Sequence, residues 1–551
     1  MDTRERALQR LQEEEFDLLI VGGGITGAGA FRDAVRRGLK VALVEAVDFA
    51  FGTSSRSSKL VHGGLRYLEN REFSLVFEAV SERRILMNIA PHLVNPLAFL
   101  FPVYEDSKVG FNTIRAGMWL YDALALFRAP KTHKTLSNKQ IKESIPLLSQ
   151  EGLKGAPLYY DCATDDARLT LETILDGIDG DGVALNYTRV TGFVRGRDGR
   201  ICGARVRDTL NKSAEDFELK ATAVINATGP WTDRTRAMGS GGDRLLRPTK
   251  GVHIVIDAER LPTDWAVVHT HPEDGRVLFT IPWGDRTYIG TTDTDFQGDP
   301  AEVAATSSDV DYLLAAVNHF FPGCDLVRDD VIATWAGLRP LISQEGSESA
   351  VSREHEIFVD RDGLITIAGG KLTTYRRMGA EVVSKAMTML SMLGKIPDAQ
   401  DPQTGREPLP GAVGWPEDDD AEKLAAEVRA ACDGIEPDTA TYLANRYGTR
   451  AIDIARLALD NQRLRSRLAE GRPEILAEVD WAVRRELCCT VCDFMVRRSQ
   501  LYYRNYDQGL GATAAVVERM GELLGWDAQH RTEEALAYQA EVARSRKWQT
   551  G

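Results

Sequence analysis

The stretch that decides the fold is residues 16–67, FDLLIVGGGITGAGAFRDAVRRGLKVALVEAVDFAFGTSSRSSKLVHGGLRY. Apolar runs at 16–21 and 40–44 predict two strands, and the run at 26–37 between them predicts a helix. A turn with the spacing G-x-G-x-x-G separates the first strand from the helix, and the second strand ends in Glu45. This order of strand, glycine turn, helix, strand and acid is the dinucleotide-binding fingerprint in the context that it requires.

Each glycine of that turn has its own role. The first makes the tight turn, the second lets the backbone approach a diphosphate, and the third lets the helix pack close to the strand. The helix start offers unpaired N–H groups and a partial positive charge to the phosphates. The acid at the end of the second strand lies at about the expected distance of ~20 residues for binding ribose hydroxyls, and its charge disfavours a 2′-phosphate. The cofactor contacts expected here are Gly22, Gly24, Ile25, Thr26, Gly27 and Glu45.

Length and composition indicate a soluble protein of two or three domains. The 551 residues exceed what one hydrophobic core usually organises, and 43% hydrophobic with 27% charged residues is typical of globular proteins. A net charge of −14 argues against general nucleic-acid binding. The sequence contains no apolar run long enough to span a membrane, and its charged start lacks the apolar region of a secretory signal. We expect a cytoplasmic protein with a solvated N-terminal helix or tail.

The seven cysteines are scattered and odd in number, which fits a reduced chain. Cys488, Cys489 and Cys492 form a cluster, but no second ligand pair and no histidine follows nearby. They lie in an apolar-periodic, helical stretch, so we expect buried small hydrophobic side chains there and no metal site.

A hydroxyl- and glycine-rich segment, TSSRSSKLVHGGLRYLE at 53–69, follows the strand that carries the acid. In an NAD-linked dehydrogenase this region is normally helical, whereas this composition suits a larger cofactor lying extended across the domain. Its hydroxyls and backbone N–H groups can bind a diphosphate or the edge of a flavin; an ordinary loop is the alternative. The expected cofactor contacts are Thr53, Ser54, Ser55, Ser58, Lys59, Leu60, His62, Gly63 and Gly64.

A second strand-to-helix junction lies at 364–390, where a strand meets Gly369-Gly370 and a helix begins near Thr373. Another apolar strand runs into a small turn at 227–231. Two junctions far apart in sequence can serve one cofactor, one at the diphosphate and the other at the redox ring. The contacts expected from these turns are Ala227, Thr228, Gly229, Trp231, Gly370, Leu372 and Thr373.

The remaining chain divides into strand-rich and helical segments. Alternating patterns at 182–225 and 250–295 predict antiparallel strands, and helical patterns occur at 73–90 and 308–321. The apolar helix expected at 111–127 fits either a membrane interface or a buried position. We favour the buried position because basic residues do not line a clear polar face.

The motifs resemble those of the FAD-dependent glycerol-3-phosphate dehydrogenases of the quinone-linked respiratory type. In this family's order they are GGGITGAG, TSSRSSKLVHGGLRYLE, DDARL, NATGPW, KGVHIV, IPWGD, IGTTDTD, GLRPL and GGKLTTYR, spanning about residues 16–380. The pair HGGLRYLE and GGKLTTYR is specific. The related glycerophosphate oxidases share much of it but are typically longer through an insertion.

This resemblance implies an α/β fold of the D-amino-acid-oxidase type: a doubly wound, Rossmann-like FAD-binding domain interleaved with an antiparallel substrate-binding sheet. The expected divisions are 14–90, 182–245 and 330–395 for the FAD-binding domain, 91–181 and 246–329 for the substrate-binding cap, 396–419 for a linker, and 420–545 for a C-terminal helical domain. The linker assignment depends on its Pro, Gly and acidic content.

The reaction implied is oxidation of sn-glycerol 3-phosphate to dihydroxyacetone phosphate, with a hydride passing from C2 to flavin N5 and electrons then passing to a quinone. The resemblance assigns substrate binding to Arg339, Arg353, Lys371 and Thr374, and catalysis to His253, Arg66, Tyr67 and Arg339. Of these, His253 has the best intrinsic pKa for a base, although a buried core histidine is the alternative. His62 is the other candidate for the base, although its place in the hydroxyl-rich segment suggests packing against the flavin.

A quinone acceptor implies peripheral contact with the inner face of the cell membrane. The sequence does not decide between a monomer and a homodimer. Three alternatives compete with this function: an oxidase that uses oxygen or acts on an amine, a non-catalytic flavin-binding sensor, and an NAD-linked dehydrogenase. The last is disfavoured because the hydroxyl-rich segment and the second glycine junction would then have no purpose.

Overall fold

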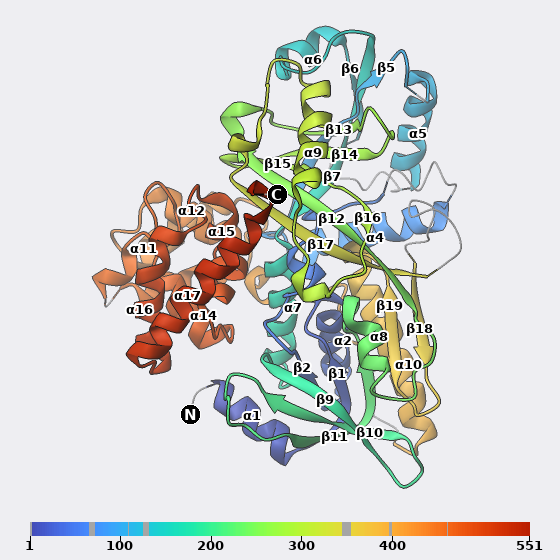
Figure 1. Ribbon diagram of the computed structural model, residues 1–551, viewed down its shortest axis with the longest axis vertical. Helices are drawn as coiled ribbons and strands as arrows, with labels where there is room; N and C mark the ends of the chain where they lie inside the picture. Colours follow the sequence, from blue (N-terminus) through green and yellow to red (C-terminus); the bar gives the residue numbers. More distant parts are fainter. Residues whose placement is uncertain are drawn as a thin grey trace.

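The computed structural model describes residues 3–64, 72–107, 109–124, 132–343, 354–395, 399–459 and 461–550. Figure 1 shows a sheet with its helices at the bottom, a second sheet at the top, and a body of helices from the C-terminal part at the left. This arrangement confirms the predicted α/β class with a C-terminal helical domain.

The lower sheet carries the fingerprint. Its strands follow the order β18-β19-β11-β1-β2-β8, with β9 and β10 attached beside β11. The bounds are β1 (Glu15–Val21), β2 (Val41–Val44), β8 (Val183–Leu185), β9 (Thr188–Arg195), β10 (Ile201–Asp208), β11 (Phe217–Asn226), β18 (His355–Val359) and β19 (Ile365–Gly369). From β19 to β8 the pairs are parallel, so their carboxyl ends meet at one edge.

Both faces of this sheet are covered, which explains the continuous apolar run of β1. Leu18 and Ile20 point to a core shared with three helices, whereas Leu19 and Val21 point to the opposite core. The three helices are α2 (Ile25–Arg36), α7 (Asp166–Asp179) and α10 (Tyr375–Met392). The short α8 (Thr232–Arg236) follows β11.

The upper sheet is built around two long antiparallel strands, β12 and β17. Its strands are β3 (Leu60–Val61), β4 (Val94–Leu100), β5 (Val103–Tyr104), β6 (Lys134–Leu136), β7 (Leu153–Thr164), β12 (Leu246–Asp257), β13 (Ala266–Thr270), β14 (Val277–Trp283), β15 (Arg286–Gly290), β16 (Thr294–Asp295) and β17 (Ala333–Ile342). The associated helices are α4 (Phe73–Ile89), α5 (Phe111–Leu124), α6 (Asn138–Ser144) and α9 (Ser307–Phe320).

The C-terminal part is helical, as predicted. It comprises α11 (Ala421–Ala431), α12 (Pro437–Tyr447), α13 (Ala451–Leu457), α14 (Ala477–Arg485), a π-helix (Asp493–Arg498), α15 (Leu501–Arg504), α16 (Thr513–Leu524) and α17 (Ala528–Ser545). Before it, residues 399–419 pack against the rest of the chain: Leu409 is fully buried, and the Gly411 N–H donates to Glu172.

The expectation about the exposure of the N-terminal segment is confirmed, and the one about α5 is wrong. The N-terminal segment forms a largely solvated helix, α1 (Thr3–Glu13), in which Leu11 is buried in a core beneath the lower sheet and Arg4 pairs with Asp208. Conversely, α5 is not a buried helix. Trp119 on this helix is 59% exposed and Leu120 is 41% exposed, since α5 packs on the upper sheet through one side only.

Two segments lie on the other side of the expected domain boundaries. The strand β17 belongs to the upper sheet, because its whole length pairs with β12, although residues 330–395 were assigned to the FAD-binding domain. The helix α7 covers the lower sheet, because its apolar face joins the core of α2, although residues 91–181 were assigned to the cap. Pairing and packing partners distant in sequence decide both placements.

Candidate active site

The fingerprint turn has a geometry that only glycine permits. Gly22 has φ +113°, and a Cβ on it would lie 2.6 Å from the carbonyl oxygen of Ala227. A Cβ on Gly27 would lie 1.9 Å from the carbonyl oxygen of Gly22. At the start of α2, Gly24 provides no side-chain cap, and the Ile25 N–H donates to Ser54 Oγ at 2.9 Å. This open helix start is the kind that binds a diphosphate.

Glu45 lies where the fingerprint requires it. Its carboxylate accepts the Gly23 N–H at 2.8 Å and the Val47 N–H at 3.0 Å. Burial raises the pKa of Glu45, an effect that these two N–H donors partly offset. The acid is thus fixed beside the glycine turn at the carboxyl end of β2, the position for contacting ribose hydroxyls.

The second glycine junction reaches the same edge. Gly369 and Gly370 have φ +76° and +86°, and Leu372–Thr374 form a 3-10 turn that leads into α10. Thr373 Oγ1 accepts the His62 N–H at 3.1 Å and lies 3.2 Å from the His62 carbonyl oxygen. The hydroxyl-rich segment and the second junction therefore touch, as one shared cofactor requires.

The helices that begin at the two junctions also lie side by side. A Cβ on Gly379 of α10 would lie 2.5 Å from the carbonyl carbon of Gly29 on α2, so glycine on both helices permits the close approach. Between them, β11 ends in the predicted turn, where Thr228 Oγ1 donates to Asn226 and Trp231 lies over Gly52. The residues present fit an extended dinucleotide cofactor along this edge.

The hydroxyl-rich segment divides its side chains between the cofactor edge and the protein. The Ser55 hydroxyl is buried and has no hydrogen-bond partner among the described residues, which is expected if it meets a cofactor. Thr53 Oγ1 donates to the Leu338 carbonyl at 2.6 Å. The Lys59 ammonium points elsewhere: it pairs with Asp166 at 2.7 Å inside an aromatic cage. The cage is formed by Trp283, Trp335 and Tyr503.

Arg339 lies on β17 with its guanidinium held in place. It donates to Asp293 at 3.1 Å and to Thr291 Oγ1 and the Thr292 carbonyl at 3.2 Å each. Gly251 on the neighbouring strand leaves room for it, since a Cβ there would lie 2.7 Å from Arg339 Nη2. Burial alone would raise the pKa of Asp293, but Arg339, together with Thr249 and Arg276, holds it below its ordinary value.

Lys371 and Thr374 begin the second junction. Lys371 is half-buried at the start of the 3-10 turn, and Thr374 Oγ1 donates to its carbonyl at 3.4 Å. Arg66, Tyr67 and Arg353 lie outside the described residues.

His253 is more enclosed than its predicted role requires. Its ring stacks on Trp335 with 4.6 Å between centroids, and Nε2 lies 2.9 Å from Ser58 Oγ. Nδ1 is buried and has no partner among the described residues. Burial first, and then the positive charges of Arg339 and Lys59, lower the pKa of His253 well below its ordinary value. The imidazole is therefore neutral and weakly basic.

Several residues of the site had no assigned role in the sequence prediction. Asp293 anchors Arg339, Asp166 neutralises Lys59, and Asp161 accepts the Gly63 N–H at 3.0 Å. Asp293 lies in the motif IGTTDTD and Asp166 in the motif DDARL, so these motifs could have identified both residues as part of the site. No pattern marks Asp161. The predicted burial of Cys488 and Cys489 is confirmed, and burial raises the pKa of both thiols. The helical prediction is wrong for these two residues, because they lie in the loop between α14 and the π-helix.

The comparisons with known proteins agree with this geometry. The model of the DAO family, FAD dependent oxidoreductase, matches residues 17–376, and a model described as the C-terminal domain of alpha-glycerophosphate oxidase matches residues 402–531. The chain belongs to the DAO family of FAD-dependent oxidoreductases. The predicted family and the predicted cofactor, FAD, are thereby confirmed.

The relatives are more specific. The chain is similar to the aerobic glycerol-3-phosphate dehydrogenase of Staphylococcus haemolyticus, with 39% identity over 96% of this chain and 95% of the relative. The Staphylococcus aureus protein of the same name is 38% identical over 95% of this chain and 93% of the relative.

Solved structures show the same relationship. The glycerol-3-phosphate dehydrogenase of Bacillus halodurans, complexed with FAD, has a TM-score of 0.81 and 33% identity, covering 99% of this chain and 98% of that chain. The L-alpha-glycerophosphate oxidase of Mycoplasma pneumoniae has a TM-score of 0.53 and 18% identity over 69% of this chain and 95% of that chain, so it shows the shared fold alone.

Proposed function

We propose that this protein oxidises sn-glycerol 3-phosphate to dihydroxyacetone phosphate. The observation that carries the proposal is the contact of the hydroxyl-rich segment with the second glycine junction, and with the strand that presents the anchored Arg339. The helices that follow the two glycine junctions pack side by side at Gly29 and Gly379. The names of the relatives at 38–39% identity support the same substrate. Bound FAD would take the hydride from C2. The chain's own residues must then bind the phosphate and accept the proton of the C2 hydroxyl.

The substrate phosphate is assigned to Arg339 and Lys371, with Arg353 as a third cation. An arginine fork binds a phosphate through two parallel N–H bonds, and a lysine adds a point charge. Arg339 suits this role because Asp293 and Thr291 hold its guanidinium in one orientation before substrate arrives. Thr374 supports the turn that carries Lys371. Arg66 and Tyr67 would orient the substrate oxygen.

Proton acceptance is better assigned to His62 than to His253. The depressed pKa and shielded Nδ1 of His253 make it a weak and poorly accessible base. His62 is only half-buried and lies where the hydroxyl-rich segment contacts the second glycine junction, since its backbone N–H and carbonyl both bond to Thr373 Oγ1. His253 then serves to position Ser58 and the hydroxyl-rich segment.

The start of α10 would stabilise negative charge on the reduced cofactor. The 3-10 turn at Leu372–Thr374 and the long helix behind it direct backbone N–H groups toward the cofactor edge. A helix start carries a partial positive charge that favours an anion.

We propose a quinone as electron acceptor, reached at a membrane surface. Among the described residues no helix has the length and apolar character to cross a membrane. The neighbouring helices α4 and α5 instead expose large apolar side chains. These are Phe73, Phe77, Trp119 and Leu120, exposed by 44%, 46%, 59% and 41%. Exposed apolar side chains on two neighbouring helices fit the interfacial region of a bilayer.

Vesicle flotation tests the membrane contact. The double variant Trp119→Ser with Phe77→Ser should lose most binding to anionic phospholipid vesicles while keeping its FAD spectrum. The control Val359→Ser removes an apolar side chain of 43% exposure on β18 and should bind as wild type. Equal binding by all three proteins would exclude this patch as the contact.

Oxygen is the alternative acceptor. The match of residues 402–531 to a domain described from alpha-glycerophosphate oxidase favours it.

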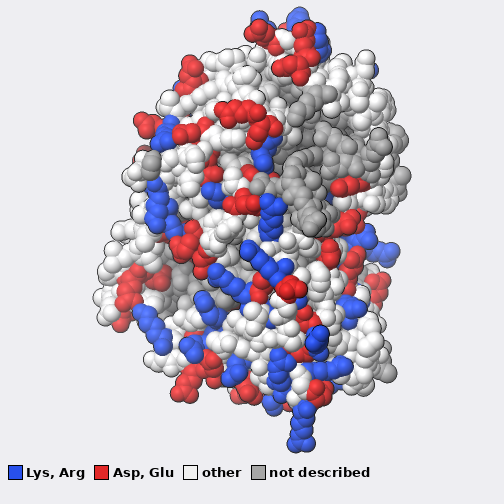
Figure 2. All heavy atoms as spheres, turned by 45° about the vertical axis from the view of Figure 1, so that its right-hand side comes forward, with Lys and Arg blue, Asp and Glu red and all other residues white. Residues whose placement is uncertain are grey.

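Basic and acidic side chains are interspersed over the face in Figure 2, which agrees with a small-molecule substrate rather than a nucleic acid.

An anaerobic visible spectrum tests the function directly. Adding sn-glycerol 3-phosphate to the purified holoenzyme should bleach the flavin band, and free glycerol at the same concentration should not. Persistence of the oxidised spectrum would favour a sensor. Reoxidation by a soluble quinone analogue under argon, faster than by air alone, would support the dehydrogenase over the oxidase.

A further inference from the structure

The acid that meets the cofactor begins a short loop, residues 45–52, called the acid loop below. Two contacts tie it to the fingerprint turn, and both are to Gly23: the Glu45 carboxylate accepts the Gly23 N–H at 2.8 Å, and the Ala50 N–H donates to the Gly23 carbonyl at 3.0 Å. The conformation of the acid loop therefore sets the position of Glu45 and of the glycine turn together.

Asp48, in the middle of the acid loop, points away from the cofactor edge into the C-terminal domain. Its side chain is fully buried. Arg497 and Arg498, consecutive residues of the π-helix Asp493–Arg498, both donate to its carboxylate, the second through two nitrogens. Asn186 completes the set, donating to Asp48 at 3.1 Å and to the Leu487 carbonyl of the C-terminal domain at 2.8 Å.

This buried cluster contains two carboxylates and two guanidinium groups, so its positive and negative charges balance. Burial would raise the pKa of Asp48, but Arg498 and Arg497 outweigh it and hold the pKa below its ordinary value. Arg497 also pairs with Asp493 at 2.7 Å, and the Tyr187 hydroxyl donates to the same carboxylate at 2.6 Å. Moving this buried carboxylate would break its ion pairs with both arginines at once, leaving Arg497 with Asp493 and Arg498 with the Glu486 carbonyl.

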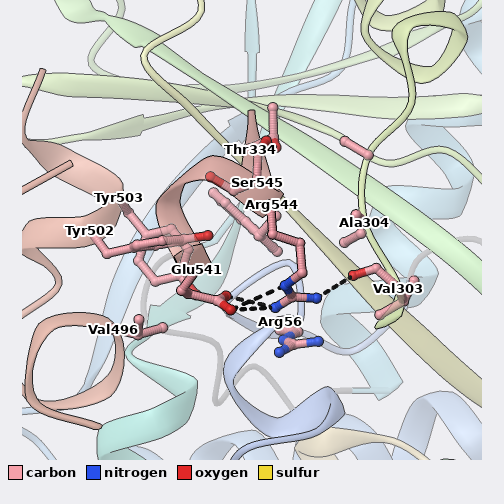
Figure 3. A pocket seen from close by; sticks show the side chains of 13 residues that line it. Arg56, Val303, Ala304, Thr334, Val496, Tyr502, Tyr503, Glu541, Arg544 and Ser545 are labelled. Carbon is pink, nitrogen blue, oxygen red and sulfur yellow. Dashed lines mark hydrogen bonds and ion pairs between the residues drawn. The ribbon is translucent and has the colours of Figure 1, made fainter. Parts of the chain in front are cut away.

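The Phe51 side chain of the acid loop lies next to a less tightly paired arginine, Arg56. Phe51 lies between Arg497, at 5.8 Å, and Arg56, at 5.1 Å from its ring centroid. Figure 3 shows the cavity that follows, where Arg56 lies under the Glu541–Arg544 pair and makes no ion pair of its own among the described residues. Where the acid loop meets the C-terminal domain, the charge is therefore closely paired at Asp48, whereas Arg56 borders a cavity.

We propose that the C-terminal helical domain holds FAD in place through Asp48, with Arg497 and Arg498 as its anchors. Asp48 acts as a positioning residue: it touches neither substrate nor cofactor, and it fixes the loop that carries Glu45. Docking of the C-terminal domain and retention of FAD are therefore one coupled event.

Reconstitution of the apoprotein with FAD, followed by flavin fluorescence, tests the coupling without any substrate. Asp48→Asn should raise the Kd for FAD at least tenfold. The control is Arg519→Gln, which breaks an ion pair with Asp480 inside the C-terminal domain. It should lower the melting temperature and leave the Kd for FAD unchanged.

Arg498→Lys keeps the charge and loses the fork, so it covers the case in which Asp48→Asn does not fold; it should raise the Kd for FAD about threefold or more. Wild-type FAD affinity in folded Arg498→Lys and Asp48→Asn would overturn the proposal. So would an equal loss of affinity in Arg519→Gln, because general destabilisation would then explain the effect. Failure of the substrate assignment would leave all of these measurements unaffected.

Discussion

The fingerprint turn and the substrate face around Arg339 are held by different kinds of contact. At the turn, backbone atoms approach within distances that only glycine allows, as at Gly27, and the helix start supplies the donors. At the substrate face, the functional groups are side chains, and each depends on a partner from another strand: Asp293 holds Arg339, and Ser58 contacts His253.

This difference predicts which amino-acid substitutions each region tolerates. A backbone site fails when any atom is added, because the clash is unavoidable. A side-chain site fails in degrees, because a partner can be lost while the group itself remains. The effects of substitution should therefore be largest at Gly22 and Gly27, where an added Cβ would meet a backbone carbonyl oxygen, and graded at the substrate face.

The largest effect is expected from Gly27→Ala. A Cβ there would lie 1.9 Å from the Gly22 carbonyl oxygen, so α2 must move away from β1. FAD binding should be lost, measured as absence of the flavin band after purification and reconstitution. Gly117→Ala is the control, since no atom lies within 4 Å of a Cβ there and helix propensity favours alanine by up to about 1 kcal/mol. A yellow Gly27→Ala protein would show that the turn is not backbone-limited.

The next effect separates the two histidines. His62→Ala should lower kcat by about 10²-fold or more, as loss of a general base does, with FAD still bound. His253→Ala should lower kcat about tenfold or less, because its neutral, enclosed ring does not suit proton transfer. Stopped-flow reduction of the flavin measures both. A larger loss in His253→Ala would restore His253 as the base, as the sequence suggested.

Arg339→Ala should raise KM for sn-glycerol 3-phosphate by about tenfold to a hundredfold, because a hydrogen bond to a charged group contributes roughly 1.5–3 kcal/mol. The same variant should change the weak reaction of free glycerol far less. Arg328→Ala serves as the control, since this arginine forms an exposed pair with Asp311. Equal effects on both substrates would mean that Arg339 does not bind the phosphate.

The smallest effect of this series is expected from Asp293→Asn, which keeps Arg339 but loosens its anchor. KM should rise about threefold to tenfold with kcat nearly unchanged, and Asp293→Glu should recover part of the loss. Because the folded pKa of Asp293 is lowered, its ion pairs persist above its unfolded pKa of about 3.9 and are lost only as the pH falls through the lower folded value. Wild-type KM should therefore show no step from Asp293 between pH 5 and 8. A KM for Asp293→Asn equal to wild type would show that Arg339 needs no anchor.

The contrast between the regions also explains what sequence patterns could predict. The turn, its helix and Glu45 are contiguous, so spacing alone predicted their elements, as it did for the junction at Gly369-Gly370. The apolar periodicity of α4 and α9 likewise gave their bounds within a residue or two. Exposure was harder, since the apolar sequence of α5 does not reveal that Trp119 faces outward.

By itself, the sequence determined the cofactor class, the strand–helix–strand unit of the fingerprint and the second strand-to-helix junction at Gly369-Gly370, because each depends on neighbours within one supersecondary unit. Only the tertiary structure decided the sheet to which β17 belongs, the enclosure of His253, and the pairing of Asp48 with two arginines some 450 positions away. The physical reason is that burial and charge pairing depend on distances in space, and these arise when separate segments pack together.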